Sequence, residues 1–213
     1  MWFDARPAAP DWSDAQRQLS RADPAMRDLI RRVGPCTLAP RRDHFVVLCQ
    51  SIYNQQLSTA AATTLFNRFR DLFPRRRPTP PLVKDALSGG IDEPTLKTAG
   101  LSRQKRAYVL DLATHFVDGR IDTARLKRLP DEQVIAALTQ VNGIGRWTAE
   151  MFLMFVLNRP DVFPVDDLGL QEGVRREYEL TARPTPKQLL PLGEPWRPWR
   201  TVATWYLWRG GDQ

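Results

Sequence analysis

Two features of this sequence could together do chemistry on a negatively charged polymer. The first is the turn Gly143-Ile144-Gly145, and the second is the pair of carboxylates Asp166 and Asp167, which follows a proline further along the chain. Glycine has no Cβ, so the turn can be tight and can approach a partner closely. Because it opens directly into a helical pattern, its N–H groups lie at the positive end of a helix dipole and favour a phosphate. This combination suggests an enzyme that grips a phosphate backbone and places a charge beside it.

The elements that must position the turn are two helices. Apolar residues recur at helical spacing on both sides of it and predict helices over 131–141 and 146–157. Further helices are predicted over 22–33, 80–88, 92–98, 102–117, 121–127, 167–176, 186–192 and 197–209, with one long helix or two between Phe45 and Phe73. No segment shows sustained period-two alternation, so we expect an all-α fold. Residues 1–20 are expected to form an irregular arm that packs through Trp2 and Trp12.

The charge of the chain fits an anionic partner. Its 213 residues include 31 Lys and Arg against 24 Asp and Glu, a net charge of +7. An excess of this size also occurs as ordinary solubilising surface charge, so charge alone does not decide between the two interpretations. The glycine turn is what favours a phosphate polymer.

The cysteines and the apolar runs exclude several classes of protein. Cys36 and Cys49 are too few for an iron–sulfur cluster held by four cysteines, and they argue against a disulfide-rich secreted protein. We expect both to be inert core groups. No apolar run reaches transmembrane length, and the segment Met1-Trp2-Phe3-Asp4 does not resemble a signal peptide. We therefore expect a protein of the reducing cytoplasm that makes no membrane contact.

Four stretches in collinear order resemble one enzyme family. Besides the glycine turn with its carboxylates, they are the segments Ser51-Ile52-Tyr53-Asn54-Gln55-Gln56-Leu57-Ser58, Gly100-Leu101-Ser102-Arg103-Gln104-Lys105, and Trp196-Arg197-Pro198-Trp199-Arg200 running on to Trp208. Together they resemble the AlkA-type 3-methyladenine DNA glycosylases of the helix-hairpin-helix DNA glycosylase superfamily. The resemblance covers roughly residues 20 to 210.

The resemblance implies an all-α fold of two helical lobes, with a helix-hairpin-helix motif and an active-site cleft between the lobes. We expect a central lobe over 35–150 that includes the start of the hairpin. The C-terminal lobe over 151–213 would carry the catalytic aspartate, and the segment 1–34 would pack with it.

The resemblance also implies the chemistry. Asp167 matches the family's catalytic aspartate, while Asp166 is interpreted as a capping or supporting residue at the helix start. Bifunctional relatives place a lysine nucleophile just after the glycine turn, where this chain has Trp147. We therefore expect a monofunctional enzyme in which water is the nucleophile.

The DNA contacts implied by the family lie in three segments. Gly143, Gly145 and Thr148 are the candidates for the phosphate seat. Lys105 would contact backbone phosphate or support packing between the lobes. The residue that fills the gap left by a flipped-out base matches Gln56, with Leu57 beside it. The alternative is that Gln55 and Gln56 only cap helix ends.

A pocket for the base is implied by residues from several segments. Trp208 matches a tryptophan of the family's pocket, and Tyr53 is a candidate second wall. Met151 and Leu168 stand where a family pocket has tyrosines. Alkylated purines carry positive charge, which aromatic faces attract. The alternative for any one tryptophan is ordinary core packing.

The cofactor and partner expectations follow from the same resemblance. No cofactor is required, although main-chain carbonyls of Val141 and Ile144 match positions that bind a monovalent cation in the family. The expected partner is double-stranded DNA containing damaged bases, bound by a monomer. Two other functions stay open: a glycosylase of the same fold for deaminated or oxidised bases, and a non-catalytic helix-hairpin-helix DNA-binding protein.

Overall fold

The computed structural model describes residues 10–211, which fold into helices with no strand among them. The described chain forms two compact units. Unit 1 contains residues up to 42 together with those from 153 onward, and unit 2 contains residues 43–152. The all-α prediction is confirmed.

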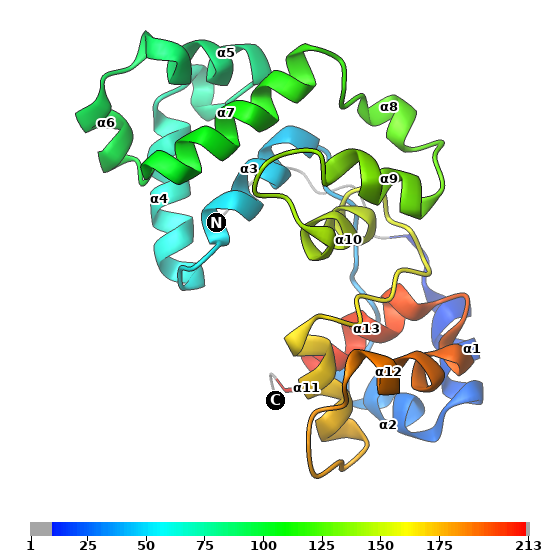
Figure 1. Cartoon of the computed structure of the whole chain (residues 1–213). Helices are drawn as coiled ribbons and strands as arrows, with labels where there is room; N and C mark the ends of the chain where they lie inside the picture. The colour runs from blue at the N-terminus through cyan, green and yellow to red at the C-terminus, as the bar shows by residue number, and fades with distance from the viewer. Residues whose placement is uncertain (1–9, 212–213) are drawn as a thin grey trace. The chain divides into compact units, whose positions relative to one another are not determined.

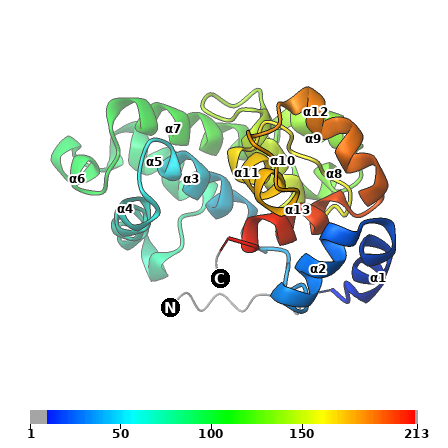
Figure 2. The ribbon, with the colours of Figure 1, turned by 90° about the horizontal axis from the view of Figure 1, so that it is seen from below.

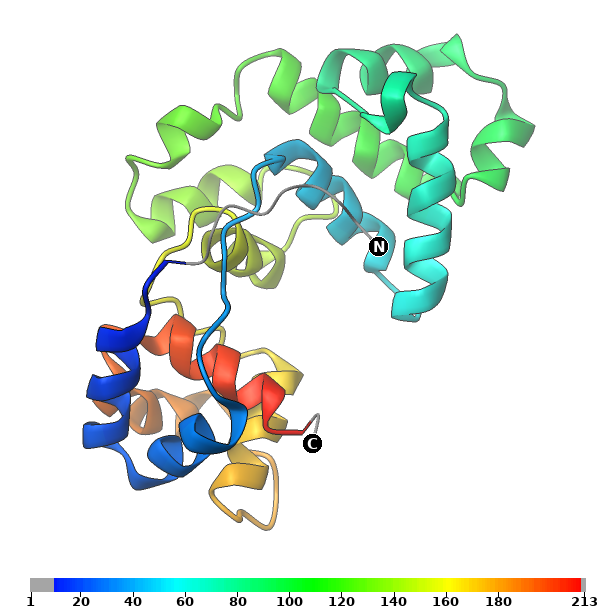
Figure 3. The same ribbon diagram turned by 180° about the vertical axis from the view of Figure 1, so that it is seen from behind.

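Unit 1 combines both ends of the chain around one core (Figure 1). Its helices are α1 (Ser13–Ala22), α2 (Pro24–Val33), α11 (Leu168–Glu177), α12 (Pro186–Gly193), the short η3 (Glu194–Trp196) and α13 (Arg200–Arg209). Figure 3 shows α13 in red beside the blue α1 and α2, which contact it. The core that these helices share includes Leu19, Met26, Leu170, Trp196 and Tyr206.

Unit 2 is a continuous segment. It holds α3 (His44–Asn54), α4 (Thr59–Asp71), η1 (Pro74–Arg76), α5 (Pro80–Asp85), η2 (Ala86–Gly90), α6 (Glu93–Thr98), α7 (Arg103–Val117), α8 (Thr123–Leu126) and α9 (Asp131–Leu138). The next helix, α10 (Arg146–Phe155), begins in unit 2 and ends in unit 1. In Figure 2, α7 runs beside α5 and α3, which both contact it.

Side-chain caps start several helices where the sequence places an acidic or hydroxyl residue. Asp23 accepts hydrogen bonds from the N–H groups of Ala25 and Met26, and Pro24 occupies the first turn of α2 as predicted. Ser58 and Ser102 cap α4 and α7 in the same way. Such caps satisfy N–H groups that have no partner within the helix.

Two predictions about helices are decided by the structure. The expected irregular arm is wrong for residues 13–20, which belong to helix α1 and bury Ala15 and Leu19. Trp12 does pack, because its side chain is buried and its indole N–H donates to the Leu38 carbonyl at 2.8 Å. Trp2 lies outside the described residues.

The segment from Phe45 to Phe73 forms two helices, α3 and α4, separated by a turn of residues 55–58. We call residues 55–58 the α3–α4 turn. The helix ends there because Gln55 is extended, with a ψ of 129°, and the next residue, Gln56, has a φ of 61°, in the left-handed region. None of the helices in the described part of the chain is long and apolar enough to cross a membrane.

Candidate active site and nucleic-acid interface

The helix-hairpin-helix motif consists of α9, the connection of residues 139–145, and the start of α10. We call this connection the hairpin turn. Gly143 has a φ of +84°, and a Cβ there would lie 2.3 Å from the ring of Tyr108. Gly145 is exposed, and a Cβ there would meet nothing within 4 Å. The first glycine is therefore required by packing, whereas the second faces open space where a partner has room.

Arg146 joins the two helices of the hairpin. Its guanidinium donates to Glu132 of α9 at 3.0 Å and to Glu150 of α10 at 3.0 Å. The hydrogen bonds from Arg146 lower the pKa of Glu132 below its ordinary value. Thr148 lies in the first turn of α10 with its side chain buried, so the group it can offer to the surface is its backbone N–H.

Helix α7 also contacts the hairpin turn. The Asp111 carboxylate accepts hydrogen bonds from the backbone N–H of Asn142 at 2.8 Å and from its side-chain amide at 2.9 Å. Together with Tyr108, which packs against Gly143, this contact fixes the shape of the turn. Sequence reasoning missed both residues, since their spacing from the turn shows no local pattern.

The α3–α4 turn presents two exposed residues. Gln56 is exposed, and Leu57 is 38% exposed despite being apolar. Both therefore fit a residue that enters DNA, and the choice between them stays a prediction. Gln55 is half-buried, and its side-chain amide donates to the Gly143 carbonyl at 2.7 Å. Gln55 is also the C-cap residue of α3, but its side chain reaches beyond that helix to the hairpin turn.

Lys105 lies beneath the α3–α4 turn. Its ammonium group donates to the Tyr53 carbonyl, in the last turn of α3, at 2.7 Å. Partial burial lowers the pKa of Lys105 below its ordinary value. A cation suits the C-terminal end of a helix, so this contact stabilises α3. A phosphate contact by Lys105 stays a prediction.

The role of pocket wall assigned to Tyr53 is wrong. Its side chain has no exposed surface and packs against Phe66 and Phe69 in the core of unit 2. Its hydroxyl donates to the Ala99 carbonyl at 3.2 Å, and burial raises its pKa well above the ordinary value. A residue enclosed in this way offers no face to a base.

Asp167 is the N-cap of α11 and is only 8% exposed. One carboxylate oxygen, Oδ1, accepts hydrogen bonds from the N–H of Leu170 at 2.6 Å and from the indole N–H of Trp208 at 2.8 Å. A capping role for Asp166 is therefore wrong, since that residue is exposed at the preceding position, and a supporting role for it stays a prediction. The capping bond and the candidate catalytic carboxylate belong to the same side chain.

Trp208 adjoins this carboxylate. Its ring is half-buried and stacks on Phe155, with ring centres 5.8 Å apart and planes inclined by 20°. A Cβ on Gly169 would lie 3.0 Å from the Trp208 ring and 3.1 Å from the Asp167 Oδ1. Gly169 thus leaves the space in which the indole reaches the carboxylate. The sequence motifs did not indicate a role for Phe155 or Gly169, although a glycine two residues after the aspartate was a usable signal.

The other two candidate pocket residues have accessible surface. Leu168 follows Asp167 directly and is 62% exposed, while Met151 on α10 is half-buried. Trp147, which stands where bifunctional relatives have a lysine, is 48% exposed in the first turn of α10. No lysine occurs anywhere in α10.

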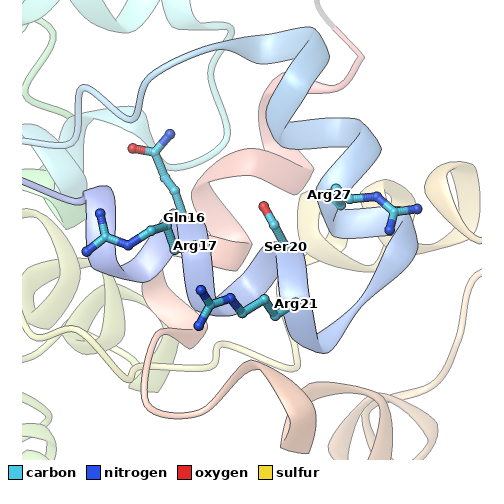
Figure 4. Close-up of a pocket in the computed structure, with 5 residues that line it drawn as sticks. All are labelled: Gln16, Arg17, Ser20, Arg21 and Arg27. Atoms are coloured by element: carbon cyan, nitrogen blue, oxygen red, sulfur yellow. The ribbon is translucent and has the colours of Figure 1, made fainter.

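One surface depression among the described residues lies away from the candidate site residues. It measures about 540 Å³ and is lined by Gln16, Arg17, Ser20 and Arg21 of α1 and by Arg27 of α2 (Figure 4). The labelled guanidinium groups in Figure 4 point in different directions and do not converge on one position. None of the candidate pocket residues lines this depression.

Side chains that could bind a metal ion or act as thiol nucleophiles were sought in the described part of the chain. It contains no group of three or more His, Cys, Asp or Glu side chains that could hold a metal ion. Cys36 and Cys49 are free and buried, and burial raises the pKa of Cys36 to about 11. The neutral thiol is a poor nucleophile, in agreement with the expectation of inert core groups.

Comparisons with known proteins bear on the whole arrangement. A family model described as HhH-GPD superfamily base excision DNA repair protein matches residues 49–198. DNA-3-methyladenine glycosylase 1 of Schizosaccharomyces pombe is 36% identical over 200 residues, covering 92% of this chain and 86% of that protein.

Solved structures agree. The 3-methyladenine DNA glycosylase of Schizosaccharomyces pombe in complex with abasic DNA matches with a TM-score of 0.83 at 35% identity, covering 94% of this chain and 98% of that one. A DNA-3-methyladenine glycosidase of Bacillus halodurans matches with a TM-score of 0.82 at 34% identity, covering 93% and 90%. The predicted resemblance is confirmed. The chain belongs to the HhH-GPD superfamily of base excision DNA repair proteins.

Proposed function

We propose that this protein is a monofunctional DNA glycosylase that excises alkylated bases, such as 3-methyladenine and 7-methylguanine, from double-stranded DNA. The observation that carries the proposal is the Asp167 carboxylate, held by two hydrogen bonds beside the Trp208 ring. Relatives named DNA-3-methyladenine glycosylase support the choice of substrate.

The proposed reaction is hydrolysis of the N-glycosidic bond. The bond between base and sugar breaks with its electron pair on the base, and the sugar becomes an oxocarbenium-like cation. A fixed carboxylate stabilises that cation and orients the water that adds to the anomeric carbon. The water's proton leaves to the released base or to solvent. Because Leu170 and Trp208 both donate to Oδ1, the Asp167 carboxylate is oriented before the substrate binds.

Aromatic and apolar surface near Asp167 supports recognition of alkylated bases. Alkylation at N3 of adenine or N7 of guanine leaves the base positively charged and weakens its bond to the sugar. The stacked pair Trp208 and Phe155 provides an electron-rich face for such a cation. Leu168 adds an exposed apolar side chain next to the carboxylate.

Unit 2 supplies the proposed grip on DNA. The exposed hairpin turn at Gly145 and the first-turn N–H groups of α10 form the proposed phosphate seat. Gln56 is the proposed residue that fills the gap left by the flipped base. We propose that one chain acts as a monomer, in the cytoplasm, where its two free thiols suit a reducing environment.

Hydrolysis of this bond needs water and no redox or group-carrying cofactor. The hairpin turn could in addition hold a monovalent cation through the carbonyls of Val141 and Ile144. The Val141 carbonyl accepts the N–H of Ile144 at 3.0 Å, and a carbonyl oxygen has a second lone pair for a cation. Such an ion would place positive charge beside a DNA phosphate.

A panel of substrates tests the proposed function. Oligonucleotide duplexes, each with one alkylated, deaminated or oxidised base, are incubated with the protein and scored for abasic sites, with Asp167→Asn as the control. We expect release of alkylated bases by the wild type and not by the variant. Release of only oxidised or deaminated bases would contradict the substrate class, and release of no base would contradict the enzyme assignment.

A further inference from the structure

The α3–α4 turn and the hairpin turn are directly connected within unit 2. The amide of Gln55 donates to the carbonyl of Gly143 at 2.7 Å, although the two residues are 88 positions apart in the chain. Figure 1 shows the end of α3 and the α9–α10 connection side by side. Gln55 is half-buried at this contact, whereas the next residue, Gln56, is exposed.

Helix α7 braces both turns from one face. Lys105, Tyr108 and Asp111 follow one another at intervals of three residues, which places them on the same side of the helix. Lys105 bonds to the carbonyl of Tyr53 at the end of α3. Tyr108 packs against Gly143, and Asp111 bonds to Asn142. The end of α3 and the hairpin turn are thus both anchored to α7, and the bond from Gln55 joins the α3–α4 turn to the hairpin turn.

The conformation of Gln56 depends on this support. A φ of 61° is uncommon for a residue with a side chain, so its surroundings must hold it there. Contacts on both sides hold the turn, since Gln55 before it is bonded to the hairpin turn and Ser58, two residues after it, caps α4. The direction of the Gln56 side chain is therefore coupled to the position of Gly143.

We propose that Gln55 is a positioning residue that sets the distance between the phosphate seat and the residue filling the gap in DNA. The inference rests on the proposed function. In a duplex, the spacing between a phosphate and a neighbouring base step is fixed by the DNA. A protein that binds the phosphate with one turn and inserts a side chain at the base step with another needs the same spacing between these two turns. Through Gln55, binding of a phosphate at the hairpin turn places Gln56 at the base step.

The alternative is that Gln55 only terminates α3. In that case its loss would destabilise the protein and reduce excision from every substrate alike. The positioning role predicts a different result for the two substrates, because a single strand has no gap to fill and no fixed phosphate-to-base spacing. Only excision from duplex should then depend on Gln55.

The test uses two replacements that remove the donor. Gln55→Met keeps the length of the side chain, and Gln55→Glu keeps its shape but turns an oxygen toward the Gly143 carbonyl. The matched control is Gln133→Met, an exposed glutamine on α9. Single-turnover excision of 3-methyladenine should fall roughly tenfold in duplex for both Gln55 variants, as expected for one lost hydrogen bond. Excision from the single strand should match the control, and a thermal melt should show both variants folded at the assay temperature.

A double variant separates positioning from independent contributions. Gln55→Met combined with Gln56→Ala should be no slower on duplex than Gln56→Ala alone, since Gln55 acts through Gln56. Multiplying defects, or equal losses on duplex and single strand, would overturn the proposal.

A second measurement does not depend on excision. A 2-aminopurine placed opposite an abasic site reports by fluorescence whether a side chain enters the gap. Wild type and Gln133→Met should change its signal, whereas Gln55→Met and Gln56→Ala should not. A protein that shows this pattern but releases no base would retain the inference while losing the proposed function. A signal change that persists in Gln55→Met would overturn the inference alone.

Discussion

The two units place their candidate functional groups in contrasting ways. In unit 1 the group is a single buried side chain, Asp167, held by two hydrogen bonds. In unit 2 the groups belong to exposed turns. Side chains of α7 support these turns through hydrogen bonds to the end of α3 and to the hairpin turn. A developing positive charge requires one fixed counter-charge, whereas a repetitive phosphate backbone requires accessible donors. Substitutions in unit 1 should therefore change the rate of excision, and substitutions in unit 2 should change binding or its geometry.

The largest effect is expected at Asp167. Asp167→Asn should reduce excision by at least about a thousandfold, because the charge facing the developing cation is lost. Affinity for lesion-containing duplex should stay within about threefold, since the charge contributes to catalysis more than to grip. The control is Asp166→Asn, an exposed neighbour of the same type, which should retain activity. Activity of Asp167→Asn within threefold of wild type would remove Asp167 from the reaction.

Gly145 tests the role of unit 2 in binding DNA. Gly145→Asp should weaken binding to every DNA sequence by roughly ten- to a hundredfold, because it adds a negative charge at the phosphate seat. The variant should fold, since a Cβ there meets nothing within 4 Å. Filter binding across salt concentrations measures both the loss and a shallower salt slope. Unchanged affinity in the folded variant would exclude the hairpin turn from the interface.

Gly143→Ala is the informative contrast to that substitution. Its Cβ would overlap the Tyr108 ring and its φ of +84° is unfavourable for alanine. We expect a loss of roughly 1–3 kcal/mol in the free energy of unfolding, measured by denaturant titration. An alanine tolerated at both glycines would mean that the two positions are equivalent after all.

A smaller effect is expected at Trp208. Trp208→Phe keeps an aromatic ring beside Phe155 but removes the N–H that bonds to Asp167. Excision should slow about tenfold, in line with the loss of one hydrogen bond to a charged group. The effect should fall on the single-turnover rate and leave the affinity for DNA unchanged. If affinity alone changed, Trp208 would act in holding the base and not in orienting the carboxylate.

In the α3–α4 turn we expect an effect on rate of similar size to that at Trp208, but confined to duplex DNA. Gln56→Ala should impair excision from duplex by about 1–2 kcal/mol in the barrier and leave single strands unaffected. Leu57→Ala is the matched variant, because both residues are exposed. A duplex-selective defect in Leu57→Ala alone would assign the gap-filling role to the apolar residue.

Borohydride reduction tests whether the protein forms a covalent intermediate with DNA. Because Trp147 stands where a lysine nucleophile would be, borohydride should trap no covalent protein–DNA adduct during excision. A trapped adduct that disappears on replacing one specific lysine would show the enzyme to be bifunctional.

The elements of the fold were largely predictable, because their signals are local. The cap at Asp23 and Pro24 and the apolar spacing around the hairpin act over a few residues. Helix α1 escaped prediction because its buried side is short, with Ala15 and Leu19 among mostly polar neighbours. Its stability comes from packing against residues far away in the chain.

The candidate site was predictable in its residue types but less so in its contacts. The motif identified Asp167 and Trp208 separately, but not the hydrogen bond between them. The bond from Gln55 to Gly143 joins residues 88 positions apart, and no periodicity encodes such a pair. Tyr53 was misplaced for the same reason, since a tyrosine in a motif has no local signal that distinguishes a pocket wall from a core residue.

The division of unit 1 between both ends of the chain has a consequence for the order in which the molecule is made. Residues 43–152 are continuous and can begin to fold as the ribosome releases them. Asp167 gains its partner Trp208 only when α13 has been synthesised, and α1 and α2, which already contact each other, gain their contacts with α13 only then. An unfinished chain therefore carries the hairpin without an assembled carboxylate site.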